Sequence, residues 1–132
     1  MIGLEFKHLT RNQEKLICSL SRRRKRKQHG LCLCEGLRAC EELYASCPDL
    51  INYAVIPESL NPEQLSVFEN IDFYVLADSR FKNLTSTVNS QGILFVSTIP
   101  SYPESSCLEL PFILVLDRIA DPGNFGTIMR TA

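Results

Sequence analysis

Apolar positions along residues 10–97 switch repeatedly between helical spacing and the alternation typical of strands. A helix is expected after Thr10, a helix-capping residue type, and it extends through Leu20 because Leu16 and Ile17 share its apolar face. The further expected elements are a strand at 31–35, a helix from 36 to 47, a strand at 53–56, a helix from Asn61, a strand at 72–77, a short helix capped by Asp78 or Ser79, and a strand at 92–97. Four strands that alternate with helices predict a compact α/β sandwich.

The pattern changes after residue 97. Residues 98–106 contain two prolines and four serine or threonine hydroxyls, which is typical of a linker. The apolar run at 111–117 predicts a strand buried on both faces of a parallel sheet, followed by a loop and a helix. We therefore expect a first domain over 1–97, a linker over 98–110, and the beginning of a second α/β domain over 111–132. One strand and one helix cannot bury their own apolar faces, so the chain is expected to be the front part of a longer protein.

Composition is that of an ordinary globular protein, with 45% apolar and 22% charged residues. No stretch approaches the roughly 18 consecutive apolar residues of a membrane span. The first residues lack the charged-then-apolar pattern of a signal peptide. Together these features predict a cytoplasmic protein with no membrane partner.

The net charge of −1 conceals a strong segregation. Residues 1–47 hold ten basic and five acidic side chains, a balance of +5, whereas residues 48–132 hold four and ten, a balance of −6. Six basic residues are consecutive, namely Arg22, Arg23, Arg24, Lys25, Arg26 and Lys27. Such a run favours a nucleic-acid surface, and its alternative is a solvated, self-repelling loop without a partner.

The six cysteines, at 18, 32, 34, 40, 47 and 107, match no common zinc spacing, so no metal is expected. They are interpreted as buried, reduced thiols: Cys32 and Cys34 share one face of a strand, and Cys40 and Cys47 fall on a helical apolar stripe. His8 and His29 lie in polar surroundings without a partner pattern, which does not favour catalysis.

The loop at 117–126 follows the expected buried strand, at the sheet edge where α/β proteins bind ligands. Pro122 and Gly123 are expected to make a turn there. Asn124 is expected to cap the following helix, and Arg130 could present its guanidinium to a phosphate near the helix start.

Three segments resemble the SpoU/TrmH RNA ribose 2'-O-methyltransferases. Residues 121–132, Asp-Pro-Gly-Asn-Phe-Gly-Thr-Ile-Met-Arg-Thr-Ala, resemble the first signature motif of that family. Residues 21–36, in which the basic run leads into a strand and a Glu-Gly pair, are similar to the start of its substrate-binding domain. A weaker match lies at 87–92. Cys32 and Cys34 stand where bulkier apolar residues are expected, which affects packing rather than chemistry.

The resemblance implies an L30e-like α/β sandwich followed by the first strand and helix of a knotted α/β (SPOUT) domain. Such enzymes transfer methyl from S-adenosylmethionine to a ribose 2'-hydroxyl of ribosomal or transfer RNA. The resemblance places Asn124 and Arg130 at the target nucleotide, the basic run and Glu35 on RNA, and the full-length enzyme in a homodimer. Glu35 has the alternative role of positioning its strand–helix turn. The family's cofactor-binding motifs lie further along its chains, so these 132 residues alone are expected neither to bind S-adenosylmethionine nor to methylate RNA.

Two other functions stay open. The chain could be a free-standing, non-enzymatic L30e-like RNA-binding protein, with residues 107–132 as a vestigial tail. It could also be an interaction module whose oppositely charged halves mediate assembly. A reading frame that continues past Ala132 with two more Gly-rich motifs would favour the methyltransferase, and failure to bind structured ribosomal RNA at low salt would favour the interaction module.

Overall fold

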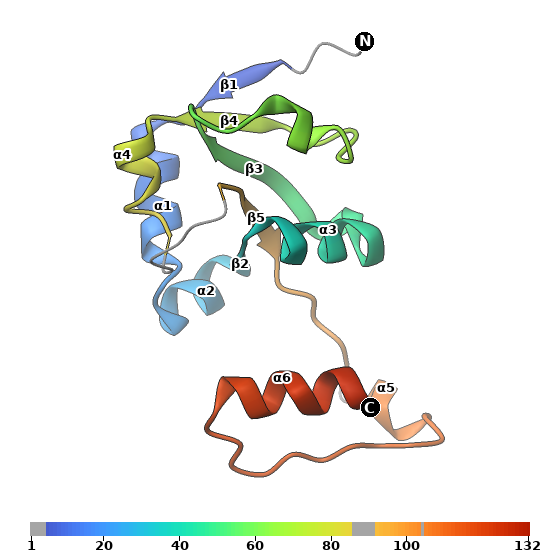
Figure 1. Ribbon diagram of the computed structural model, residues 1–132. Helices are drawn as coiled ribbons and strands as arrows, with labels where there is room; N and C mark the ends of the chain where they lie inside the picture. Colours follow the sequence, from blue (N-terminus) through green and yellow to red (C-terminus); the bar gives the residue numbers. More distant parts are fainter. Residues whose placement is uncertain (1–4, 86–91, 104) are drawn as a thin grey trace. The chain divides into compact units, whose positions relative to one another are not determined.

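The computed structural model describes residues 5–85, 92–103 and 105–132 (Figure 1). The chain divides into two compact units, Met1–Pro100 and Ser101–Ala132, and each is described by itself. None of the helices in the described ranges combines the length and the apolar character that crossing a lipid bilayer requires.

The first unit is built on a five-stranded sheet with the order β1-β4-β3-β5-β2. Its strands are β1 (Phe6–His8), β2 (Leu31–Glu35), β3 (Ile51–Pro57), β4 (Phe73–Leu76) and β5 (Leu94–Thr98). β4 runs parallel to β1 and β3, whereas β5 runs antiparallel to β3 and β2. The predicted α/β class is confirmed, and β1 is a strand that the apolar pattern does not reveal.

Helices cover both faces of the sheet (Figure 1). On one face, α1 (Arg11–Ser19) and α4 (Asp78–Phe81) contribute Ile17 and Phe81 to a core with Val55. On the other face, α3 (Leu37–Ser46) and the 3₁₀ helix η2 (Pro62–Leu65) contribute Cys40 and Leu65. The remaining elements of this unit are α2 (Arg23–His29) and the 3₁₀ helix η1 (Pro48–Leu50). Adjacent residues of β5 serve opposite cores, as the period of two requires.

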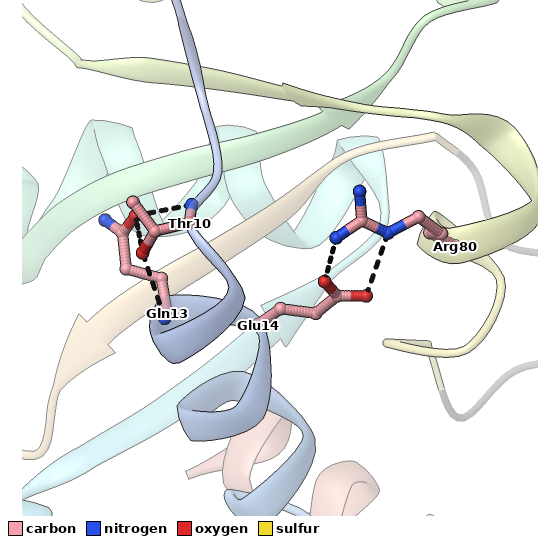
Figure 2. A network of polar contacts seen from close by, with 4 residues as sticks. All are labelled: Thr10, Gln13, Glu14 and Arg80. Atoms are coloured by element: carbon pink, nitrogen blue, oxygen red, sulfur yellow. Dashed lines mark hydrogen bonds and ion pairs between the residues drawn. The ribbon is translucent and has the colours of Figure 1, made fainter.

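Thr10 caps α1 as predicted (Figure 2). Its hydroxyl accepts a hydrogen bond from the backbone N–H of Gln13 at 3.2 Å, and the Gln13 side-chain oxygen accepts one from the backbone N–H of Thr10 at 2.9 Å. This reciprocal capping box satisfies two donors at the helix start. It orients α1 at the point where the chain leaves β1.

Two other helix starts differ from the prediction. Ala77, not Asp78 or Ser79, occupies the capping position of α4. The Asp78 carboxylate instead accepts a hydrogen bond from the backbone N–H of Ser59 at 3.1 Å. Asn61 does cap the element that follows it, by accepting from the backbone N–H of Glu63, but that element is a 3₁₀ helix rather than an α-helix.

The second unit contains α5 (Ser105–Leu108) and α6 (Pro122–Thr131). The prediction of a buried strand at 111–117 is wrong for this unit, because that segment forms no strand and Val115 is 80% exposed. A parallel strand needs neighbours to accept its backbone hydrogen bonds, and the described residues of this unit include no strand that could pair with it.

Asp121, not Asn124, caps α6. Its carboxylate accepts hydrogen bonds from the backbone N–H groups of Gly123 at 3.1 Å and Asn124 at 3.2 Å. Pro122 and Gly123 therefore form the first turn of the helix instead of a separate turn. Proline suits that position because its missing N–H would have no partner there.

Candidate nucleic-acid interface

The run of basic residues lies in and just before α2, rather than in a loop. Gly30 ends this helix with a φ of 64°, a left-handed conformation that favours glycine. Arg23 and Arg24 stand in the first turn, where the helix dipole disfavours positive charge, and no side chain caps that end. The helix therefore depends on contacts with the rest of the first unit.

Arg26 provides such a contact. Its Nη1 donates hydrogen bonds to the backbone carbonyl oxygens of Leu20 at 3.0 Å and Ser21 at 2.8 Å. Lys25 is also engaged, because its ammonium donates to the side-chain oxygen of Gln28 at 3.1 Å. Two of the six predicted RNA-binding cations thus have partners within the fold.

The other four cations are exposed. Within the described ranges, none of them forms an ion pair or a side-chain hydrogen bond; they are Arg22, Arg23, Arg24 and Lys27. Unpaired guanidinium and ammonium groups on a fixed helix can bind phosphate oxygens. These four side chains, which we call the basic helix cations, form the candidate interface.

Glu35 lies at the end of β2, directly before a turn that requires Gly36. Gly36 has a φ of 96°, which L side chains rarely adopt, and its N–H donates to the carbonyl oxygen of Ile93 at 3.0 Å. Glu35 is half-buried, and with Arg26 it lines a cleft of about 500 Å³ between the end of α1, β2 and residues 83–85. The cleft brings together two residues that the sequence predicted for RNA binding.

Further cations of the first unit lie along α1, and the sequence reasoning missed them. Arg11 and Lys15 are exposed and share one face of the helix. Next to them, Arg80 of α4 forms a bidentate ion pair with Glu14 of α1, including an Nε–Oε1 hydrogen bond of 3.3 Å (Figure 2). The four-residue spacing of Arg11 and Lys15 in a predicted helix is the signal that could have identified them.

The second unit places Asn124 and Arg130 on α6, both exposed. They are six positions apart, which corresponds to about 9 Å along the helix and about 120° around it. The guanidinium of Arg130 instead lies over Gly126, where an added Cβ would be 3.8 Å from its Nη2. The two side chains therefore occupy different faces of the helix. Of the third resembling segment, at 87–92, residues 87–91 lie outside the described residues.

The second unit has an open pocket whose lining residues can be compared with the groups of S-adenosylmethionine. It is lined by Phe112, Leu114, Thr127, Ile128, Thr131 and Ala132, none of them charged. Both threonine hydroxyls donate to backbone carbonyl oxygens. The lining therefore offers the two hydroxyl oxygens as acceptors, and no charged side chain for the charged groups of such a methyl donor. The described ranges also hold no cluster of three or more His, Cys, Asp or Glu side chains that could bind a metal ion.

The cysteines are less uniformly buried than predicted. Cys40 is buried, Cys32 and Cys34 are half-buried, and Cys18 and Cys47 are exposed, all as free thiols. The Cys40 thiol donates to the carbonyl oxygen of Cys34 at 3.4 Å. Hydrogen bonding from Cys40 lowers the pKa of Cys34, whereas burial raises the pKa of Cys32. The side chain of Cys107 lies outside the described residues.

Comparison with known proteins places these features in context. A family model described as the MRM3-like substrate binding domain matches residues 12–94. The chain is 30% identical over 111 residues to an uncharacterized tRNA/rRNA methyltransferase of Synechocystis, covering 81% of this chain and 40% of the relative. It is 32% identical over 100 residues to the 23S rRNA (guanosine(2553)-2'-O)-methyltransferase RlmP of Bacillus subtilis, covering 76% and 38%.

A solved structure supports the same assignment. The chain is 28% identical to a protein from Porphyromonas gingivalis described as an RNA methyltransferase of the TrmH family, with a TM-score of 0.70 over 93% of this chain and 47% of that one. The chain thus spans about 40% of the length of the first curated relatives and about half of this structure.

Proposed function

Because this chain belongs to the family of MRM3-like substrate binding domains and its relatives are SpoU/TrmH RNA methyltransferases, we propose that its first unit binds the RNA substrate of a ribose 2'-O-methyltransferase. Ribosomal RNA is the proposed substrate, since the relative RlmP is a 23S rRNA methyltransferase. The observation that carries the proposal is the set of basic helix cations, which are exposed and lack acidic partners in the described ranges.

Phosphate binding by these side chains would supply affinity with little sequence preference. Each phosphate that a cation neutralises releases condensed counterions, so affinity falls as salt rises. Glu35 and Arg26, in the cleft beside α2, would position the RNA-binding surface rather than bind phosphate. A carboxylate repels phosphate, and Arg26 is already bound to backbone carbonyls.

We further propose that Asn124 and Arg130 of α6 act at the target nucleotide of the complete enzyme, which is a homodimer in the cytoplasm and uses S-adenosylmethionine. Arginine is effectively always protonated, so Arg130 would hold a phosphate or stabilise developing oxyanion charge rather than act as a base. We expect the 132 residues alone not to bind the cofactor. Stoichiometric micromolar binding in a calorimetric titration would contradict that expectation.

The alternative is a free-standing, non-enzymatic L30e-like RNA-binding protein. It is supported by the two hydrophobic cores of the first unit, whose members in the described ranges all lie between Leu9 and Val96. Incubation of the complete protein, rather than of these 132 residues alone, with structured ribosomal RNA and isotopically labelled S-adenosylmethionine separates the two functions, because methyl transfer to RNA excludes the alternative.

The RNA-binding proposal is tested by replacing Arg22, Arg23 and Arg24 together with alanine. Fluorescence anisotropy with a labelled ribosomal RNA fragment should show weaker binding, and the slope of log affinity against log salt should flatten by about 2 to 3. Arg38→Ala, an exposed cation at the start of α3, is the matched control. Unchanged affinity and slope in the triple variant, with an unchanged circular dichroism spectrum, would overturn the proposal.

A further inference from the structure

A groove of about 600 Å³ runs along α1 beside α4. Its lining residues are Arg11, Glu14, Lys15, Cys18, Ser19, Arg22 and Arg80. Four of these seven side chains are basic and one is acidic, although the whole chain carries a net charge of −1. The groove is therefore a concentrated positive surface outside α2.

Helical geometry aligns the groove's cations. Arg11, Lys15 and Cys18 follow a spacing of four and three residues, so they lie within one narrow face of α1. They span about 10 Å along the helix axis, with about 6 Å between Arg11 and Lys15. Arg11 and Lys15 thus lie in line along the helix axis, an arrangement that suits an extended polyanion.

The ion pair between Glu14 and Arg80 connects two of the residues that line the groove (Figure 2). It joins α1 to α4 across 66 positions of sequence and neutralises the only acidic side chain among the lining residues. Three cations remain without an ion pair in the described ranges: Arg11, Lys15 and Arg22. The groove keeps a net positive charge after pairing.

Arg22 connects this groove to the basic helix. It lines the groove and directly precedes the first residue of α2, so the positive surface continues from α1 onto Arg23 and Arg24 without interruption in the chain. The lining also includes no large apolar side chain. Protein partners bind mainly through buried apolar or aromatic side chains, and the groove offers such a side chain no large apolar residue to pack against.

We propose that the groove between α1 and α4 holds the phosphodiester backbone of the RNA, which continues from it onto α2. This inference rests on the proposed RNA binding and specifies the path of the bound strand. Successive phosphates contact Arg11, Lys15 and Arg22. The bound RNA covers Cys18, which lines the groove.

The position of Cys18 permits a direct test in the unaltered chain. Cys18 and Cys47 are both exposed free thiols, but only Cys18 lines the groove. Bound ribosomal RNA should slow alkylation of Cys18 by a maleimide at least several-fold and leave Cys47 unchanged, as measured by mass spectrometry of peptides. If the RNA binds and Cys18 reacts at the same rate, the groove assignment is wrong while RNA binding by α2 stands. Equal protection by polyglutamate at the same charge concentration would overturn RNA as the occupant.

A variant with Arg11→Gln and Lys15→Gln provides the second test. It should weaken RNA binding and flatten the salt slope by about 1.5, because two phosphate contacts are lost. Arg38→Gln, on the opposite face of the sheet, should change neither value. An equal loss in Arg38→Gln would overturn the groove assignment. Absence of binding by the unaltered chain at low salt would instead overturn the proposed function.

Discussion

Arg26 is hydrogen-bonded to the backbone carbonyl of Leu20, the C-cap residue of α1. A second hydrogen bond from the same Nη1 reaches the carbonyl of Ser21. Carbonyl groups at a helix end lack intrahelical partners and carry partial negative charge. One guanidinium therefore satisfies the end of α1 and holds α2 in place, which separates Arg26 in role from the basic residues beside it.

Arg26→Ala should lower the free energy of unfolding by about 1–2 kcal/mol, because it removes two hydrogen bonds from a charged donor at a partly exposed site. Arg24→Ala, which removes an exposed cation from the same helix, should change it by less than about 0.5 kcal/mol. Urea unfolding followed by circular dichroism measures both. Equal effects of the two substitutions would contradict the structural role of Arg26.

Gly92→Ala should destabilise the first unit more than Gly30→Ala. Both glycines have positive φ, 75° and 64°, so each substitution costs roughly 1 kcal/mol or more in backbone conformation. At Gly92 the new Cβ would also lie 2.8 Å from Cδ1 of Leu60, whereas at Gly30 it meets no atom within 4 Å. Thermal unfolding should give Gly92→Ala a lower melting temperature than Gly30→Ala. Adding Leu60→Ala to the Gly92→Ala variant should remove the steric part of that difference. Similar melting temperatures for the two single variants would show that Leu60 moves aside without cost.

Cys34 should be alkylated at lower pH than Cys32. Hydrogen bonding between the Cys40 and Cys34 side chains lowers the pKa of Cys34 in spite of its partial burial, so its reactive thiolate forms at lower pH, whereas burial raises the pKa of Cys32. Iodoacetamide labelling across pH 6–10, resolved by mass spectrometry, measures both profiles. Cys40→Ala removes the donor and should shift the Cys34 profile to higher pH. A profile that does not move would contradict this assignment.

Glu14→Gln should strengthen RNA binding by about three-fold at low salt, because it releases Arg80 to contact phosphate in the groove. Stability should change by less than about 1 kcal/mol, since the Arg80 side chain is 46% exposed and exposed ion pairs contribute little. Anisotropy titrations of the variant and the unaltered chain compare the affinities. Weaker RNA binding by the variant would mean that the ion pair itself, rather than the freed cation, supports the interface.

The parts of the fold that the sequence predicted are those encoded locally. Thr10 with Gln13, the alternating residues of β2 and the short apolar run of β5 specify their elements within a few positions. β1 has three exposed residues and exists through its pairing with β4, more than sixty positions away, so no local pattern reveals it. The strand order depends on such distant pairings throughout.

The candidate site follows the same division. The sequence shows the cations of the site as a run, but consecutive like charges argue against a helix there. The helix α2 is stabilised by the hydrogen bond from Arg26 to Leu20 and by the left-handed Gly30 at its end. Asn124 was predicted as a cap because it is a favourable residue type, yet Asp121 precedes a proline at the first helical position and takes that place. The groove combines residues of α1 and α4 that only the packing of the sheet brings together.

The charges of α2 give the first unit two opposite responses to ionic strength. Arg23 and Lys27 lie one helical turn apart and repel each other, and with Arg24 they oppose the formation of the helix that presents them. Added salt screens that repulsion and stabilises the free domain, while the same salt weakens its hold on a polyanion. The phosphates of a bound strand neutralise the same charges that salt ions would otherwise screen. Ligand binding and helix formation are therefore thermodynamically linked. At low salt the free domain is therefore least stable, and at low salt it also binds a polyanion most tightly.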